Sequence, residues 1–246
     1  MNNRYFIVAA LTAFSCGSAA FAEVVPLASL GLYNTGVKAD GSALNSAGSV
    51  DPHFILTSVP NGSNVTQVGT PLAGAPSAWV QGANSLWIGP NNTSGNNVPS
   101  TDLDGPVGTY KYSTNFNLTG YNPASFSLTG QWSTDNEGLD ILLNGVLTGT
   151  SIPYGNNSSD YSFVSFHSFT FTDKFVNGNN TLDFIVYNSA IGAGSRNPTG
   201  VNVEFTAANG VTMASDTTAT PEPGTFALLG GAVLALGIAR RRSSAK

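Results

Sequence analysis

The central part of the chain alternates hydrophobic and polar residues with the two-residue period of β-strands that bury one face. Leu182, Phe184 and Val186, for example, fall on one face of their segment, and Phe163 and Phe171 share a face of another. The predicted strands are 110–118, 125–132, 139–143, 163–172, 181–187 and 201–205. No stretch of this part shows the 3.6-residue period of an amphipathic helix, so we expect none there.

Turn signals separate the predicted strands. Asn144-Gly145 follows residues 139–143 and fits a type I′ hairpin, because both central positions of that turn need positive φ. Asn177-Gly178 marks another turn, just before residues 181–187. Short strands separated by Gly, Asn and Pro predict an all-β fold, an antiparallel β-sandwich or jelly roll.

Composition and charge narrow the function classes. The chain has 246 residues, of which only 9% are charged, and it contains one Cys and two His. A disulfide framework is impossible with one thiol, and a zinc site of the Cys/His type has too few ligands. Residues 23–220 hold four basic and 13 acidic residues, a net charge of −9. This acidic surface argues against nucleic acid, so we expect no nucleic-acid partner.

Residues 1–22 predict a signal peptide. Its parts are the basic residue Arg4, the apolar residues 5–14 and the cleavage site at Ala20 and Ala22. A buried first helix is one alternative. A lipoprotein signal with Cys16 as the acceptor is another, but Ala13 stands where such a signal prefers Leu. We therefore expect the export translocon and signal peptidase as partners.

The C-terminal residues 221–246 form a second hydrophobic segment. It consists of Pro221, Glu222, Pro223 and Gly224, the uncharged residues 226–239, and Arg240, Arg241 and Arg242. As a helix, the uncharged residues span roughly 21 Å at about 1.5 Å each, less than a hydrocarbon core of about 30 Å. Snorkelling arginines and a thinner bilayer still allow a single span. We expect one hydrophobic helix as membrane anchor, preceded by a polar stalk at 211–220.

The Pro-Glu-Pro-Gly sequence, the apolar helix and the terminal arginines resemble a PEP-CTERM sorting signal. The resemblance implies a Gram-negative bacterium whose exosortase recognises the Pro-Glu-Pro segment and processes the tail. Proteins with this signal are typically linked to the extracellular polysaccharide matrix. It thus implies a location at the cell surface or in the matrix, with anchoring through the C-terminus that is at least transient. An ordinary tail anchor is the alternative.

A second resemblance covers residues 128–205. The segments that carry it are Leu128–Trp132, Asp135-Asn136, Leu143–Gly145 and Gly178–Phe184. In this order they are similar to the galactose-binding-like jelly roll, where a strand leads into an Asn-Gly hairpin and a later turn opens a buried strand. The resemblance implies a β-sandwich ectodomain over residues 23–210, similar to accessory sugar-binding domains of glycosidases. Ligand residues of this fold lie in variable loops, so the ligand stays open.

One short segment gathers candidate ligand groups. Asp135, Asn136, Glu137 and Asp140 bring three carboxylates and an amide together within six residues. Oxygen ligands at this density can bind calcium, which makes Asp135, Glu137 and Asp140 a candidate calcium site and calcium the candidate cofactor. The acidic residues 102–104 are a second candidate. The alternatives are a turn whose side chains bond their own backbone, or a glycosidase pair with carboxyls about 5–9.5 Å apart.

Aromatic side chains supply the other candidates for ligand binding. Trp79 and Trp87 lie near loop sequences, where an indole face can stack on a sugar ring while residues 135–137 bond its hydroxyls. Packing in the core is the alternative for both. His167 alternates with phenylalanines, and His53 follows Asp51-Pro52 in a turn sequence. We therefore assign neither a catalytic role and predict no catalytic residue.

These observations predict an exported, non-catalytic protein of the cell surface or extracellular matrix that binds polysaccharide. Two alternatives stay open. One is an extracellular hydrolase of glycosidase type, which would use the acidic residues at 135–140. The other is a purely structural matrix protein without a ligand.

Overall fold

A computed structural model describes part of the chain. The described residues are 22–44, 49–60, 68–69, 76–90, 105–156, 161–190 and 197–213. The chain divides into one compact unit that ends at Thr212 and a second from Met213 to Lys246. The predicted cleavage site at Ala20, most of the stalk, the C-terminal helix and the acidic residues 102–104 lie outside the described residues. Within the described ranges, no helix is both long and apolar enough to span a membrane.

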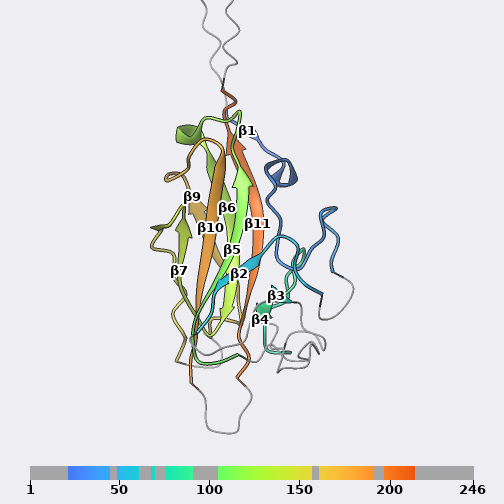
Figure 1. Cartoon of the computed structure of the whole chain (residues 1–246), viewed down its shortest axis with the longest axis vertical. Coiled ribbons are helices and arrows are strands. Elements are labelled where there is room, and N and C mark those ends of the chain that lie inside the picture. Colours follow the sequence, from blue (N-terminus) through green and yellow to red (C-terminus); the bar gives the residue numbers. More distant parts are fainter. Residues whose placement is uncertain are drawn as a thin grey trace, which may run out of the picture. The chain divides into compact units, whose positions relative to one another are not determined.

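The described residues form β-strands and two short 3-10 helices (Figure 1). In chain order these are β1 (Glu23–Val24), η1 (Leu27–Leu30), β2 (Ile55–Ser58), β3 (Val68–Gly69), β4 (Gly89–Pro90), β5 (Gly108–Asn117), η2 (Pro123–Ser125), β6 (Ser127–Asp135), β7 (Glu137–Leu143), β8 (Val146–Leu147), β9 (His167–Phe171), β10 (Asn179–Asn188) and β11 (Gly200–Gly210).

Two antiparallel sheets make up the domain. One has the order β1-β11-β6-β9 and the other β2-β5-β10-β7-β8, while β3 and β4 form a separate pair. From β5 to β11 each strand lies in the opposite sheet from its predecessor, except β8, which forms a hairpin with β7. This arrangement confirms the predicted all-β class and agrees with an antiparallel β-sandwich.

The hydrophobic core lies where the sequence alternation predicts it. Leu182, Phe184 and Val186 on β10 are fully buried. Trp132 on β6 packs against Phe184 with the ring centroids 5.8 Å apart, so side chains of the two sheets meet. Gly138 on β7 makes room for this indole, because a Cβ added there would lie 2.6 Å from the Trp132 ring.

The predicted turns are also present. Asn144 and Gly145 both have positive φ, 54° and 79°, and they join β7 to β8. These values fit the type I′ hairpin that the Asn-Gly pair predicts. Gly178, with φ of 80°, precedes β10 and completes the second predicted turn.

The strand predicted over 163–172 is too long at its start, because β9 begins four residues later. The Phe163 carbonyl accepts a hydrogen bond from the Val80 N–H at 2.7 Å. Its ring packs against Trp79 and Trp87. These contacts come from a distant part of the chain, and the local alternation could not predict them.

The two ends of the sandwich are defined by the register of β11. Gly210 pairs with Glu23 of β1 at one end, which we call the attachment end. Gly200 pairs with Asp135 of β6 at the other, the distal end (Figure 1). At about 3.3 Å per residue, the strand separates these ends by roughly 33 Å. The Val211 carbonyl still accepts a hydrogen bond from the 121–122 turn, so the domain continues just past the predicted start of the stalk.

Candidate functional site

The predicted site segment lies where the chain crosses between the sheets at the distal end. Asp135 ends β6 of one sheet and Glu137 begins β7 of the other, so Asp135 and Asn136 form the corner between them. The peptide bond that joins the two corner residues is cis. Both side chains are buried, with exposed fractions of 3% for Asp135 and 6% for Asn136.

The Asp135 carboxyl is buried beside its neighbour in the corner. Its Oδ1 accepts a hydrogen bond from Asn136 Nδ2 at 2.7 Å. Burial raises the pKa of Asp135 to about 7, and a hydrogen bond from the Trp79 side chain opposes part of that rise. The carboxyl therefore changes its charge near neutral pH.

Asn136 fixes the other half of the corner. Its Oδ1 accepts a hydrogen bond from the Ser189 N–H at 2.7 Å. Its main-chain carbonyl accepts from Thr134 Oγ1 at 3.1 Å and from the Ser162 hydroxyl. Two other chain segments, at Ser162 and Ser189, thus hold the corner in one geometry before any ligand binds.

The two tryptophans support the corner from inside the domain. Trp79 and Trp87 have exposed fractions of 3% and 2%, and their ring centroids lie 4.2 Å apart. Trp87 Nε1 donates to the Val80 carbonyl at 2.7 Å. Each indole is packed inside the domain, so neither presents an open face for stacking on a sugar. Both tryptophans therefore occupy the core position that the sequence analysis gave as the alternative.

The aromatic rings that reach solvent near the corner belong to other residues. Tyr154 is 37% exposed and stacks on Tyr161, with centroids 4.9 Å apart and planes at 15°. The Tyr161 ring in turn packs against the Phe163 ring, with the two centroids 5.2 Å apart. We call Tyr154 and Tyr161 the tyrosine pair. In the sequence, the only sign of this pair was that both tyrosines fall in a polar loop segment rather than on an alternating strand.

Strand register places the tyrosine pair beside the corner. Gly138 and Ile152 form an antiparallel bridge. In an antiparallel pair, a step of two residues forward from Ile152 is matched by a step of two residues back from Gly138. Tyr154 therefore lies across from Asn136. Partial burial raises the pKa of Tyr154, and the neighbouring Tyr161 and the corner carboxyl raise it further.

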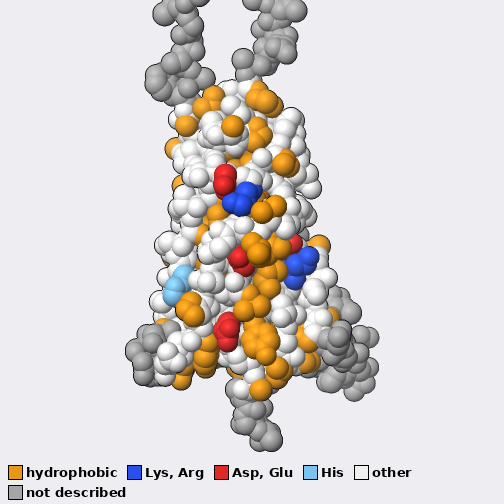
Figure 2. Space-filling view, turned by 90° about the vertical axis from the view of Figure 1, so that its left-hand side faces the viewer, with side chains coloured by type: hydrophobic (Ala, Val, Ile, Leu, Met, Phe, Trp, Pro, Cys, Tyr) orange, Lys and Arg blue, Asp and Glu red, His pale blue; other side chains and the backbone are white. Residues whose placement is uncertain are grey.

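Exposed hydrophobic side chains lie on the side of the domain that carries β7 and β8. Leu139 on β7 and Val146 and Leu147 on β8 are 42%, 51% and 65% exposed. Figure 2, which faces the side that carries β7 in Figure 1, shows a hydrophobic stripe along the lower half of this surface with acidic side chains beside it. This side of the domain thus carries apolar side chains beside carboxylates.

The predicted calcium ligands do not converge. Asp135 belongs to one sheet, whereas Glu137 and Asp140 belong to the other. The Asp140 carboxylate accepts hydrogen bonds from the N–H groups of Gly149 and Thr150, both at 3.0 Å, so it holds a turn. Among the described residues, no three acidic, His or Cys side chains gather as a metal-binding group. The structure therefore does not bring these three carboxylates together in one group.

Comparison with known proteins identifies the C-terminal segment. Residues 219–243 match the PEP-CTERM protein-sorting motif, which confirms the sorting signal. The motif indicates an exported protein that is anchored transiently at its C-terminus before exosortase cleavage. No curated protein and no solved structure matches the chain.

Proposed function

We propose that this exported, exosortase-sorted protein binds extracellular polysaccharide without cleaving it, and that the binding surface is the tyrosine pair at the distal end. One observation carries the proposal: a stacked, partly exposed aromatic pair lies beside a rigid polar corner. Tyr154 supplies the more exposed ring, and Tyr161 supports it from the other side.

The chemistry of a sugar ring suits this surface. The C–H face of a pyranose packs on an aromatic ring, and its hydroxyls need hydrogen-bonding partners at the edge. Glu137 is half-buried directly after the corner and offers a carboxylate for these hydroxyls. Trp79 and Asp135, which sequence reasoning placed against the ligand, act beneath the surface and hold the corner.

The location in the fold supports the same proposal. The domain ends at the attachment end, roughly 33 Å along β11 from the corner. A ligand at the distal end is therefore clear of the point where the tail joins the domain. The similarity to the galactose-binding-like jelly roll favours loops at one end of a sandwich as the place for a sugar ligand, by analogy of fold alone.

A hydrolase is the second candidate, and one observation favours it. Asp135 has a pKa of about 7, close to the value that suits a general acid at neutral pH. A glycosidase also needs a second carboxyl, for which Glu137 is the nearest in sequence. If polysaccharide is cleaved, and Glu137→Gln or Asp135→Asn abolishes turnover, the protein is an enzyme and the non-catalytic proposal fails.

Thermal unfolding of the purified exported protein tests the proposal. The probes are soluble β-glucan, galactan and mannan, each added in excess. A polysaccharide at 100 times its Kd stabilises the folded state by about 2.7 kcal/mol, which shifts the melting temperature by several degrees. We expect such a shift with at least one of them, and a smaller shift for Tyr154→Ala. Unchanged melting with every probe would favour a purely structural matrix protein.

A further inference from the structure

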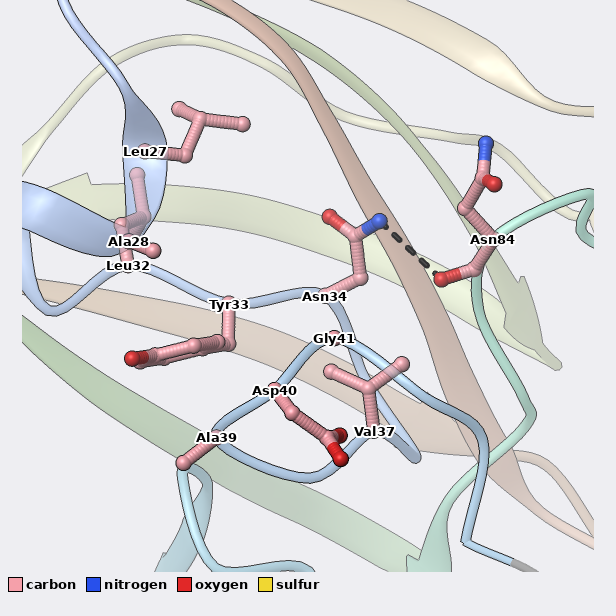
Figure 3. A pocket seen from close by; sticks show the side chains of 10 residues that line it. All are labelled: Leu27, Ala28, Leu32, Tyr33, Asn34, Val37, Ala39, Asp40, Gly41 and Asn84. Carbon is pink, nitrogen blue, oxygen red and sulfur yellow. Dashed lines mark hydrogen bonds between the residues drawn. The ribbon is translucent and has the colours of Figure 1, made fainter.

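A second candidate binding surface lies beside β11, away from the corner. It is a hollow of about 230 Å³ (Figure 3). Its lining comes from η1, the loop that follows it and one residue of a later loop, and includes Leu27, Tyr33, Asn34, Val37, Asp40 and Asn84. Pockets for drug-sized ligands begin at about 300 Å³, so this hollow suits a single sugar unit.

The aromatic wall of the hollow is held from behind. The Tyr33 ring stacks on His53 with centroids 3.8 Å apart and planes at 14°. The buried Asp51 carboxylate fixes that partner, because its Oδ1 accepts from the N–H groups of His53 and Phe54 at 2.7 and 2.9 Å. Its Oδ2 accepts from the Gly36 N–H at 2.6 Å and so holds the loop that carries the tyrosine.

The loop is also fastened to the sheet. Asn34 Oδ1 accepts from the Phe205 N–H of β11 at 2.8 Å, and its Nδ2 donates to the Asn84 carbonyl at 3.1 Å, the bond drawn in Figure 3. The Asn34 amide carries a second N–H, which can donate to a ligand. A wall that is fixed in advance loses little conformational entropy when it binds.

One carboxylate gives the hollow its polarity. Asp40 accepts hydrogen bonds from the Ser42 N–H and hydroxyl, at 2.9 and 2.6 Å, and both end on Oδ1. Its Oδ2 can therefore accept from a ligand. The Ser42 hydroxyl lowers the pKa of Asp40 most, so the group is charged at neutral pH. In Figure 3 it lies on the opposite side of the Tyr33 ring from Leu27 and Ala28.

The hollow continues into a second one of about 180 Å³. Val37, Gly41 and Asn84 line both, and residues 82–86 form the far wall. Two adjoining hollows of this size suit two consecutive units of one saccharide chain. We call them together the groove.

We propose that the groove binds a polysaccharide that contains 2-acetamido sugars. An acetamido group needs an apolar place for its methyl, an acceptor for its N–H and a donor for its carbonyl. Val37 supplies the first, Asp40 Oδ2 the second and Asn34 Nδ2 the third, while the sugar ring packs on Tyr33. This site is separate from the tyrosine pair, and neither proposal depends on the other.

Titration calorimetry of the purified exported protein tests the groove. The probes are the β-1,4-linked dimer and tetramer of N-acetylglucosamine, with the matching glucose oligomers, which lack the acetamido group, as the control ligands. We expect at least tenfold weaker binding of the glucose oligomers. Asp40→Asn keeps the shape and the turn but loses the Oδ2 acceptor, and it should weaken acetamido-sugar binding by tenfold or more.

Variants separate the two proposed sites. Tyr154→Ala should leave acetamido-sugar binding unchanged, and Asp40→Asn should leave any binding at the tyrosine pair unchanged. Equal affinity for both oligomer series, binding that survives Asp40→Asn, or no heat with any probe would overturn the groove proposal. Loss of binding in Tyr154→Ala alone would place the sugar at the distal end instead.

Discussion

Glu23 of β1 and Gly210 of β11 are paired directly across an antiparallel ladder. The first and last strands of the domain therefore meet at the attachment end. The register of the same strand β11 puts Gly200 opposite Asp135 at the distal end. The chain thus continues into its sorting tail from one end of the sandwich, and the corner with the tyrosine pair lies at the other end.

Loss of the sorting motif should stop processing without unfolding the domain. Replacing Pro221, Glu222 and Pro223 with alanine removes the segment that the exosortase recognises, and it lies outside the compact unit that ends at Thr212. We expect an exported chain that stays membrane-bound and keeps its C-terminal residues. Cell fractionation and the mass of the C-terminal peptide measure this outcome. Normal processing of this variant, at the rate of an Asp216→Ala control, would contradict the assignment.

Asp135 should make the stability of the fold depend on pH. Its folded pKa of about 7 exceeds the unfolded value of about 3.9, so the folded state binds more protons between these values. Its stabilising contribution is complete below about pH 4 and is lost as the pH rises through 7. The full shift corresponds to at most about 4 kcal/mol.

Urea unfolding of wild type and Asp135→Asn between about pH 4 and pH 8 measures this loss. The neutral amide does not titrate, so the stability difference should move in favour of the variant as the pH rises, and should level off above 7. Asp51, whose pKa burial also raises, is present in both proteins and cancels in the difference. A difference that stays constant over the whole range would show that Asp135 is ionised throughout.

Asp140 should stabilise a turn rather than bind calcium. Its carboxylate accepts from the N–H groups of Gly149 and Thr150 and from the Thr148 hydroxyl. Asp140→Ala removes these hydrogen bonds to a charged group and should cost about 1–3 kcal/mol. The melting temperatures of both proteins, with EDTA and with added calcium, check this. A calcium-dependent rise that disappears in the variant would restore the metal site.

Gly138 should tolerate no side chain while Trp132 is present. A Cβ at Gly138 would lie 2.6 Å from the indole, and overpacking of this kind costs about 1–3 kcal/mol. Trp132→Phe makes room, so the double variant Gly138→Ala, Trp132→Phe should lose less stability than the two single losses added together. Chemical denaturation of the four proteins gives the coupling. Strictly additive losses would mean that the two residues do not press on each other.

Much of the fold could be predicted because it depends on local patterns. The alternation around Phe184 and the Asn144-Gly145 turn each reflect the geometry of one strand or one hairpin, and both are confirmed. The sorting signal could also be predicted from the sequence, because it is a linear motif that an enzyme recognises directly.

The candidate site was harder to predict because it depends on contacts between distant segments. Asp135 and Asp140 are close in sequence but belong to different sheets, so their spacing could not show that they separate. Tyr154 reaches the corner only through the bridge between Gly138 and Ile152. Loop residues follow no period that would have revealed either relationship.

Titration calorimetry with a polysaccharide that shifts the melting temperature tests the central claim most directly. The proteins are wild type, Tyr154→Ala, Tyr154→Phe and the control Leu147→Ala, which removes an exposed side chain of β8 outside the tyrosine pair. We expect about tenfold weaker binding for Tyr154→Ala, because the ring carries the stacking, and near wild-type affinity for Tyr154→Phe and Leu147→Ala. Equal affinities in wild type and Tyr154→Ala would contradict polysaccharide binding at the distal end.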